Sequence, residues 1–138
     1  MTARTGQCLC GAVTFSTDDA SPEHTLCHCK MCQRWSGGPF LTVTSANLVF
    51  EGEENLSRFQ SSAWAERGFC NKCGSSLFYR LGKSDRYAMC VGVFDETDDF
   101  VMDEELFIDR KPAGYAFAGD HLRLTEAETM AKYKEFSA

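Results

Sequence analysis

The sequence predicts a mainly β domain, built around a structural zinc ion and carrying one or two short helices. Apolar and β-branched residues recur in short runs that Gly, Asn, Asp and Ser interrupt, a pattern typical of strands joined by turns. Seven of the eight cysteines lie in three tight clusters, and thiolates at such spacings are ligands that zinc prefers. A chain of 138 residues is long enough for a single zinc-binding domain, 1–138, with a sizeable core.

Six apolar runs bounded by turn residues are expected to form strands. They are 12–16, 40–44, 48–51, 56–60, 76–81 and 87–94. Residues 45–47 are expected to turn the chain between the second and third strands, and 82–85 to form a hairpin loop between the last two. The stretch 95–121 combines an acidic run with scattered aromatic residues, and we expect it to be mostly irregular.

Two short helices are predicted from their end signals. One is expected over 29–36, because glycines at 37 and 38 suit a helix C-terminus. The other is expected at the end of the chain. There Thr125 and Glu128 have the spacing of a capping box, and helix-forming residues follow to position 136.

The overall charge excludes some classes of partner. The formal net charge of −6 argues against nucleic-acid binding, which usually requires a basic surface, and gives no attraction to an anionic membrane. Residues 1–6 are too few and too polar for a signal peptide, and the apolar runs are too short to span a membrane. We therefore expect a cytoplasmic protein whose reduced cysteines bind metal rather than form disulfides.

The first and third cysteine clusters are expected to form one closed zinc site. Cys8 and Cys10 in a Cys-x-Cys-Gly stretch, and Cys70 and Cys73 in a Cys-x-x-Cys-Gly stretch, together supply four thiolates. Zinc in such sites contributes on the order of 10–16 kcal/mol in small peptides, so this ion would be a major source of stability. The alternatives are two unrelated pairs, or a disulfide within one of them.

The middle cluster supplies three thiolates, Cys27, Cys29 and Cys32, and no fourth ligand is evident. Catalytic zinc sites keep such a position open, where a water, a thiol or a carbonyl oxygen can bind. His28 lies between two ligands, so its side chain is expected to point away from the metal, and Cys90 is expected to be a buried structural thiol. A second structural zinc, or a site that is empty in the isolated protein, remains the alternative.

Three cations follow or precede these cysteines closely. Lys30 and Arg34 lie in the middle cluster's own segment, and Arg67 precedes Cys70. They could offset the charge of the thiolates or hold a substrate carboxylate through paired hydrogen bonds. Ordinary surface charge is the alternative interpretation, more so for Lys30 than for Arg34.

Three motifs carry a resemblance to a known family. Gly-Gln-Cys-Leu-Cys-Gly at 6–11, Cys-His-Cys-Lys-Met-Cys-Gln-Arg at 27–34 and Arg-Gly-Phe-Cys-Asn-Lys-Cys-Gly at 67–74 resemble the glutathione-dependent formaldehyde-activating enzyme family, which includes centromere protein V. The resemblance implies an antiparallel β-tent fold. It also implies a structural zinc on the four cysteines of the outer clusters, and a catalytic zinc on the middle three. Its eponymous activity is that of a carbon–sulfur lyase, which joins formaldehyde and glutathione into S-hydroxymethylglutathione.

One segment departs from the family's pattern. Many members carry His-Ile-Phe or His-Ile-Trp after the last core strand, whereas this chain reads Glu-Leu-Phe-Ile at 105–108, with Leu106 in place of the histidine.

The function expected from the sequence is that of a zinc-dependent carbon–sulfur lyase acting on a thiol–aldehyde adduct. The open zinc on Cys27, Cys29 and Cys32 would bind the substrate thiol or carbonyl oxygen, and Arg34 would hold an acidic group. Its partner would be a small-molecule thiol or thiol adduct, and the oligomeric state stays open. The alternatives are a non-catalytic zinc module that binds another protein, and a thiol-based redox sensor.

Overall fold

A computed structural model describes residues 2–133 and defines a mainly β architecture, as predicted. Its elements in chain order are β1 (Thr2–Gln7), β2 (Thr14–Ala20), β3 (Glu23–Cys27), α1 (Lys30–Ser36), β4 (Phe40–Ala46), β5 (Val49–Glu51), η1 (Glu53–Asn55), β6 (Leu56–Ser62), β7 (Ala65–Cys70), β8 (Ser76–Leu81), β9 (Tyr87–Cys90), η2 (Val91–Val93), β10 (Val101–Leu106), η3 (Ile108–Arg110), β11 (Leu122–Arg123) and α2 (Glu126–Tyr133).

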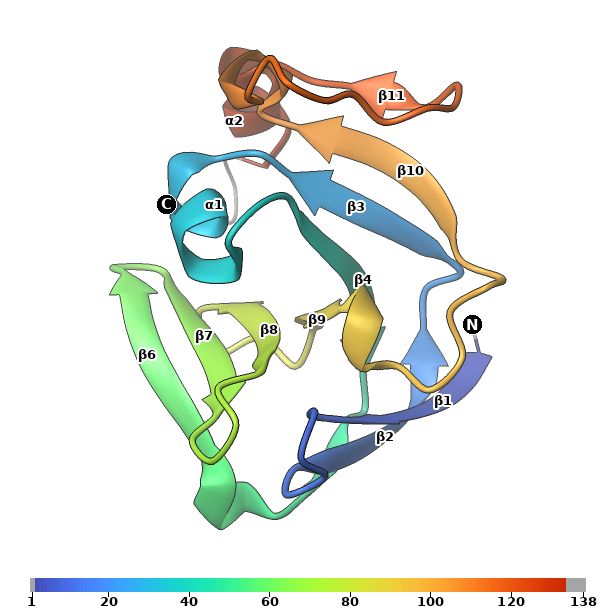
Figure 1. The fold of residues 1–138 in the computed structure, drawn as a ribbon, viewed down its shortest axis with the longest axis vertical. Helices are drawn as coiled ribbons and strands as arrows, with labels where there is room; N and C mark the ends of the chain where they lie inside the picture. Colours follow the sequence, from blue (N-terminus) through green and yellow to red (C-terminus); the bar gives the residue numbers. More distant parts are fainter. Residues whose placement is uncertain (1, 134–138) are drawn as a thin grey trace.

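The strands of the described chain belong to one mixed sheet. Its order is β11-β10-β3-β4-β9-β8-β7-β6, with β2 bridging β1, β4 and β5 beside this path. Pairing is antiparallel throughout except at β10, which runs parallel to both β3 and β11. The sheet bends strongly, so that β10, β3 and β4 form one half, β6, β7 and β8 form another, and α1 lies between them (Figure 1). This bend brings residues of β7 against α1.

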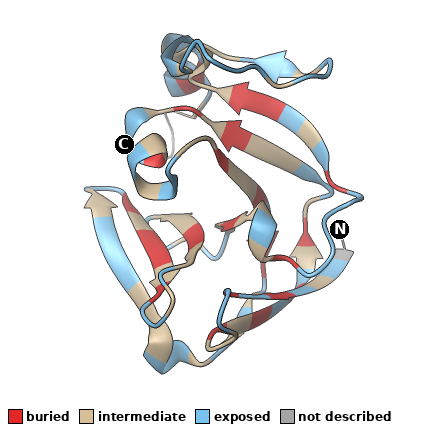
Figure 2. Ribbon diagram, viewed as in Figure 1, coloured by how far each residue is buried: buried red, intermediate tan, exposed pale blue. Residues whose placement is uncertain are grey.

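The main hydrophobic core lies where strands β2, β4, β8 and β9 of the bent sheet come together. It is formed by buried apolar side chains from β2, β4, β8 and β9, with Phe94 and Phe100 from the following loop. Buried residues alternate with exposed ones along β2, because successive side chains of a strand point to opposite faces. Figure 2 shows buried segments on β3 and β10 as well, outside this main core. Two of the buried residues on β10 are glutamates, Glu104 and Glu105.

The six predicted strands are present, one with the predicted ends (β8) and five with shifted ends, and five further strands of the described chain were missed. Strand β9 ends at Cys90 and continues as a short 3₁₀ turn, rather than as a strand to residue 94. The stretch 95–121 is mostly irregular, as predicted, but β10 runs through it and was missed. The acidic sequence of β10 hides its strand character, because its two glutamates are buried only through partners distant in the chain. Of the turn predicted at 45–47, only Asn47 lies outside β4, at a φ of 54°, whereas the predicted hairpin loop joins the paired strands β8 and β9.

Both predicted helices are present, with the predicted glycine at the end of α1 and the predicted capping box at the start of α2. The Cys29 sulfur caps α1 by accepting a hydrogen bond from the backbone N–H of Cys32, and Gly37 ends the helix at a φ of 83°. At α2 the Thr125 hydroxyl and the Glu128 carboxylate each accept the other's backbone N–H, at 3.2 and 2.9 Å. The predicted continuation of α2 to residue 136 lies outside the described residues. Neither helix of the described chain is long and apolar enough to cross a membrane.

Candidate metal centres and the adjoining cavity

The first and third cysteine clusters meet in space. Cys8 and Cys10 follow β1, while Cys70 ends β7 and Cys73 lies in the turn beyond it. Their four sulfurs all lie within 4.8 Å of one another. The Cys10 sulfur is 3.7 Å from that of Cys8 and 3.8 Å from that of Cys70. Four thiols converging at such distances could hold a tetrahedral zinc ion that ties the N-terminal strand to β7.

The backbone around this cluster is shaped for thiolate ligands. The N–H of Val13 points at the Cys8 sulfur and that of Lys72 at the Cys70 sulfur, each at 3.4 Å. Gly11 and Gly74 both adopt a φ of 79°, a left-handed conformation that a side chain would strain. The Cys-Gly endings recognised in the sequence therefore have a geometric cause.

The middle cluster gathers three sulfurs at the junction of β3 and α1. Cys27 ends the strand, Cys29 caps the helix and Cys32 lies buried in its first turn. These sulfurs also lie within 4.8 Å of one another, and no fourth donor of the described chain joins them. Cys90 stands apart from the group and is half-buried rather than fully buried, and burial raises the pKa of its thiol to about 12.

The closeness of the three sulfurs opposes their simultaneous ionisation. Hydrogen bonding to Cys29 raises the pKa of Cys27, while hydrogen bonding from Cys27 lowers the pKa of Cys29. Adjacent thiolates repel one another strongly in a half-buried site. A divalent metal removes that conflict, and sulfur donors suit zinc. The donor set therefore fits the predicted metal.

Arg67 supplies a buried positive charge to the same cluster. Its side chain comes from β7 and is only 3% exposed, and both terminal nitrogens lie 3.7 Å from the Cys32 sulfur. Aromatic rings surround its guanidinium, at 4.9 Å for Tyr79 and 5.2 Å for Trp35. No carboxylate of the described chain pairs with it. A buried arginine without a carboxylate requires another anion, and the thiolate cluster provides it.

His28 belongs to a separate buried cluster that the sequence did not reveal. Its ring is fully buried, and its Nε2 lies 2.8 Å from Oε1 of Glu105. The other oxygen of Glu105 lies 2.5 Å from Nε2 of His121 and 3.1 Å from Nε of Arg123. Burial acts to raise the pKa of Glu105, but the hydrogen bonds from His121 and His28 outweigh it and hold that pKa below the usual value. The side chain of His28 thus turns to this carboxylate, as its place between two ligands predicted.

The segment that departs from the family's pattern contributes to this cluster. Leu106 uses its backbone, where its carbonyl accepts the N–H of His28 at 3.0 Å. The neighbouring Glu105 is the residue that makes the side-chain contacts. The sequence shows Glu105 only as an acidic residue in a stretch predicted to be irregular, and nothing in it links this residue to His28 or His121.

A small cavity of about 230 Å³ opens beside α1. It is lined by Lys30, Gln33, Arg34, Gly37, Gly38, Pro112 and Tyr115. Lys30 and Arg34 are exposed and form no hydrogen bond or ion pair with any described residue. Two free cations therefore line this cavity, and both belong to the helix that carries Cys32, although no cysteine lines the cavity itself.

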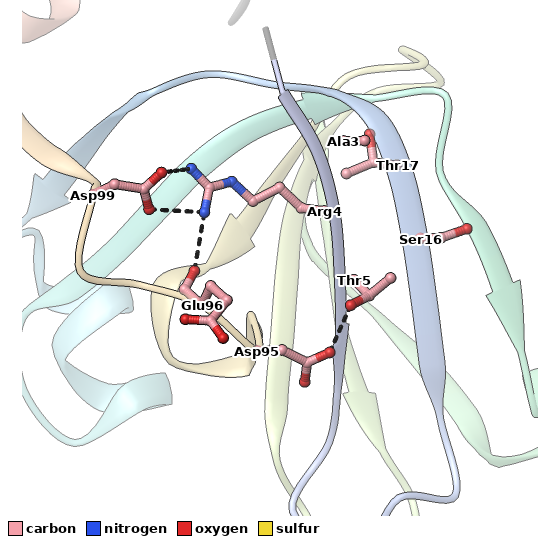
Figure 3. Close-up of a pocket in the computed structure, with 8 residues that line it drawn as sticks. All are labelled: Ala3, Arg4, Thr5, Ser16, Thr17, Asp95, Glu96 and Asp99. Atoms are coloured by element: carbon pink, nitrogen blue, oxygen red, sulfur yellow. Dashed lines mark hydrogen bonds and ion pairs between the residues drawn. The ribbon is translucent and has the colours of Figure 1, made fainter.

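A larger hollow of about 460 Å³ lies elsewhere, around the start of β1. Figure 3 shows Arg4 spanning it to pair with Asp99, at 2.7 Å, while Thr5 bonds Asp95. Arg4 also lies over the ring of Phe100. None of its lining residues is a cysteine or histidine. These contacts fasten the N-terminal strand to the loop before β10, and the hollow has no part in either thiol cluster.

The bent sheet and its two thiol clusters define a cysteine-rich β protein with two groups of thiols that could hold metal ions. The chain belongs to the family described as glutathione-dependent formaldehyde-activating enzyme, whose model matches residues 3–110. It is 33% identical over 128 residues to an uncharacterized lyase of Schizosaccharomyces pombe, covering 91% of this chain and 93% of that protein. A crystal structure of a Rhodobacter sphaeroides protein is similar in fold, with a TM-score of 0.54 and 21% identity over 86% of this chain and 98% of the other.

Proposed function

We propose that this protein is a zinc-dependent carbon–sulfur lyase that acts on an adduct of an acidic thiol and an aldehyde, such as S-hydroxymethylglutathione. Membership of the formaldehyde-activating family and similarity to a protein named a lyase support this class of reaction. The observation that carries the proposal is the cluster of Cys27, Cys29 and Cys32, which no fourth donor of the described chain joins. Such a donor set leaves a position for substrate.

The reaction needs little besides binding and proton movement. In the lyase direction the bond between carbon and sulfur breaks, the hydroxyl oxygen gives up its proton to form the aldehyde, and the sulfur leaves as thiolate or takes up that proton. A zinc ion on the three cysteines would lower the pKa of a bound thiol or polarise a carbonyl oxygen. No oxidant or reductant is consumed.

The cations around the site have separate tasks in this proposal. Arg67 is buried against Cys32 and neutralises the thiolate cluster, whose charge with one zinc ion would be −1. Lys30 and Arg34 line the cavity, are exposed and lack partners within the described chain, so they are available to a substrate carboxylate. An acidic thiol would therefore place its carboxylates on α1 and its sulfur toward the cysteines.

The test compares rates of adduct breakdown with and without the protein. We expect wild-type protein to accelerate the breakdown of S-hydroxymethylglutathione, and Cys29→Ser to lose this acceleration. Cys90→Ser is the matched control, because Cys90 lies outside the cluster, and it should keep the wild-type rate. Equal rates for wild type, Cys29→Ser and buffer, over several adducts, would refute lyase activity and favour a non-catalytic zinc module.

A second comparison tests the role assigned to the cavity. Arg34→Ala should raise the KM for the glutathione adduct about tenfold, the value of one charge-assisted contact. The same variant should leave the KM for a formaldehyde adduct of the uncharged thiol β-mercaptoethanol unchanged. Arg86→Ala serves as control, because Arg86 is exposed on the hairpin loop away from the cavity. An equal effect of Arg34→Ala on both adducts would remove Arg34 from substrate binding.

A further inference from the structure

Glu105 joins the two parts of the site that the proposed function requires. Through Oε1 it holds the ring of His28, the residue between Cys27 and Cys29. Through Oε2 it holds His121 and Arg123, which belong to the segment that covers His28. Glu105 is 1% exposed, so water does not compete for these contacts.

On the metal side, His28 is fixed at three points. Its backbone N–H donates to Leu106, its carbonyl accepts from Nε2 of Gln33 at 2.6 Å, and its ring donates to Glu105. A carboxylate only accepts hydrogen bonds, so Nε2 of His28 must carry the proton. The ring orientation, and with it the turn between Cys27 and Cys29, therefore depends on Glu105.

On the cavity side, Arg123 connects Glu105 to the segment 115–119 that lies over His28. Its Nε donates to Glu105, while Nη2 donates to the carbonyls of Phe117 and Gly119 at 2.9 and 3.1 Å. The rings of Tyr115 and Phe117 lie over His28, with centroids 6.4 and 6.1 Å from its ring. Tyr115 also lines the cavity beside α1.

We infer that Glu105 is a positioning residue that couples the turn carrying Cys27 and Cys29 to the cavity wall at Tyr115. Ligand binding in the cavity and the arrangement of the three sulfurs then depend on each other. This inference rests on the proposed function for the identity of its ligand, an acidic thiol. It does not require turnover.

The chain provides a matched control for this inference in the adjacent residue. Glu104 lies on the same strand, is 2% exposed and points to the other side of it, where its carboxylate bonds Lys132 and Tyr133 of α2. Replacing either glutamate by glutamine removes one buried carboxylate of β10. Only Glu105→Gln touches the contacts to His28 and Arg123.

The experiment follows ligand binding by the spectrum of cobalt-substituted protein, with glutathione as probe. The four-cysteine site should not respond to the thiol, so the difference spectrum reports the three-cysteine site. We expect Glu105→Gln to weaken glutathione binding roughly tenfold or more, as is usual when a residue supporting metal ligands is changed, and to alter the ligand-free spectrum. Glu104→Gln should change neither. Both variants should retain the wild-type metal content.

A second variant keeps the inference testable should Glu105→Gln fold poorly. The side chain of Arg123 is 39% exposed, so Arg123→Leu is a mild change that releases only the cavity side. It should weaken glutathione binding and leave the ligand-free cobalt spectrum unchanged. The loss of glutathione affinity in Arg123→Leu should also be non-additive with the loss in Tyr115→Ala, because both substitutions would act on the same wall of the cavity.

The outcomes separate this inference from the proposed function. Wild-type binding and spectra in Glu105→Gln, equal changes in Glu104→Gln, or a wild-type spectrum that glutathione does not alter would each overturn the coupling. Loss of coupling with lyase activity intact would leave the proposed function standing. Coupling without lyase activity would refute the proposed reaction and keep the coupling.

Discussion

Replacing the buried Arg67 should destabilise the protein more with metal in the three-cysteine site than without it. Arg67 is 3% exposed and contacts Cys32 through both terminal nitrogens. With metal bound, Arg67→Met leaves a buried anionic cluster without its counter-charge. Breaking one half of a buried ion pair costs about 3–5 kcal/mol. Without metal Cys32 keeps its proton. Hydrogen bonding to Cys27 acts to lower its pKa, but hydrogen bonding to Cys29, burial and the charge of Cys29 outweigh it and raise that pKa to about 11. Arg67 then contacts a neutral thiol, so the same substitution should cost less.

Linkage converts this difference into metal affinity. A coupling of about 3 kcal/mol corresponds to a loss of roughly 100-fold in zinc affinity, since every 1.4 kcal/mol is a factor of ten. The assay is a titration of the protein against a zinc-binding dye, which resolves the weaker, three-cysteine site from the four-cysteine site. Chemical unfolding of the loaded and partly stripped forms gives the second estimate of the same coupling.

Arg80→Met is the matched control for this measurement. Arg80 lies on the neighbouring strand β8, pairs with Glu66 at 3.1 Å and lies 4.9 Å from the ring of Tyr87. Arg80→Met therefore removes an ion pair and a contact between an arginine and an aromatic ring, but it removes no contact with sulfur. Equal zinc affinities for Arg67→Met and Arg80→Met would refute the idea that Arg67 balances the thiolates.

Three further predictions concern the other zinc site, the buried carboxylate and the packing of the sheet. Cys70→Ser should lose one zinc per chain by elemental analysis and unfold at ambient temperature by circular dichroism, because a metal contribution on the order of 10–16 kcal/mol is as large as the whole stability of a domain. Cys90→Ser should do neither. Glu105 has a lowered pKa when folded, so its stabilising contribution is present above the usual carboxyl value near 4.5 and is lost as the pH falls through the lowered value. Urea unfolding between pH 6 and 3 should therefore show wild type and Glu105→Gln converging toward acid, and parallel curves would contradict this. Gly68→Ala should cost about 1–3 kcal/mol, because the new Cβ would lie 2.2 Å from the ring of Phe78. Gly114→Ala, with nothing within 4 Å, should change stability by less than about 0.5 kcal/mol.

The parts of this fold that the sequence predicted are those determined by neighbouring residues. Helix α1 was predictable because its cap, Cys29, and its terminator, Gly37, both lie within or beside it. The convergence of the outer cysteine clusters was predictable because zinc requires four ligands, and two pairs at such spacings leave few alternatives.

The unpredicted parts depend on residues that are distant in the chain. Strand β10 was missed because Glu104 and Glu105 look like solvent-exposed residues until Lys132 and His28 are placed beside them. Nothing near His121 in the sequence indicates that it shares one carboxylate with His28. Charged residues cannot be assigned to a core by periodicity, because their burial depends on partners that only the folded chain supplies.

The two metal sites differ in how their charge is balanced, and this difference bears on their roles. Four thiolates with one zinc ion would carry a charge of −2. No described arginine contacts that cluster, and Cys10 is exposed, so solvent can stabilise the excess charge. The three-cysteine site has a lower formal charge, and Arg67 is nevertheless buried against it. An arginine held under three aromatic rings is a costly way to stabilise a purely structural ion, because burial of its charge opposes folding. The open zinc position proposed above would explain the arrangement, because a cluster neutralised by Arg67 could accept an anionic thiolate that a site of net charge −1 would repel.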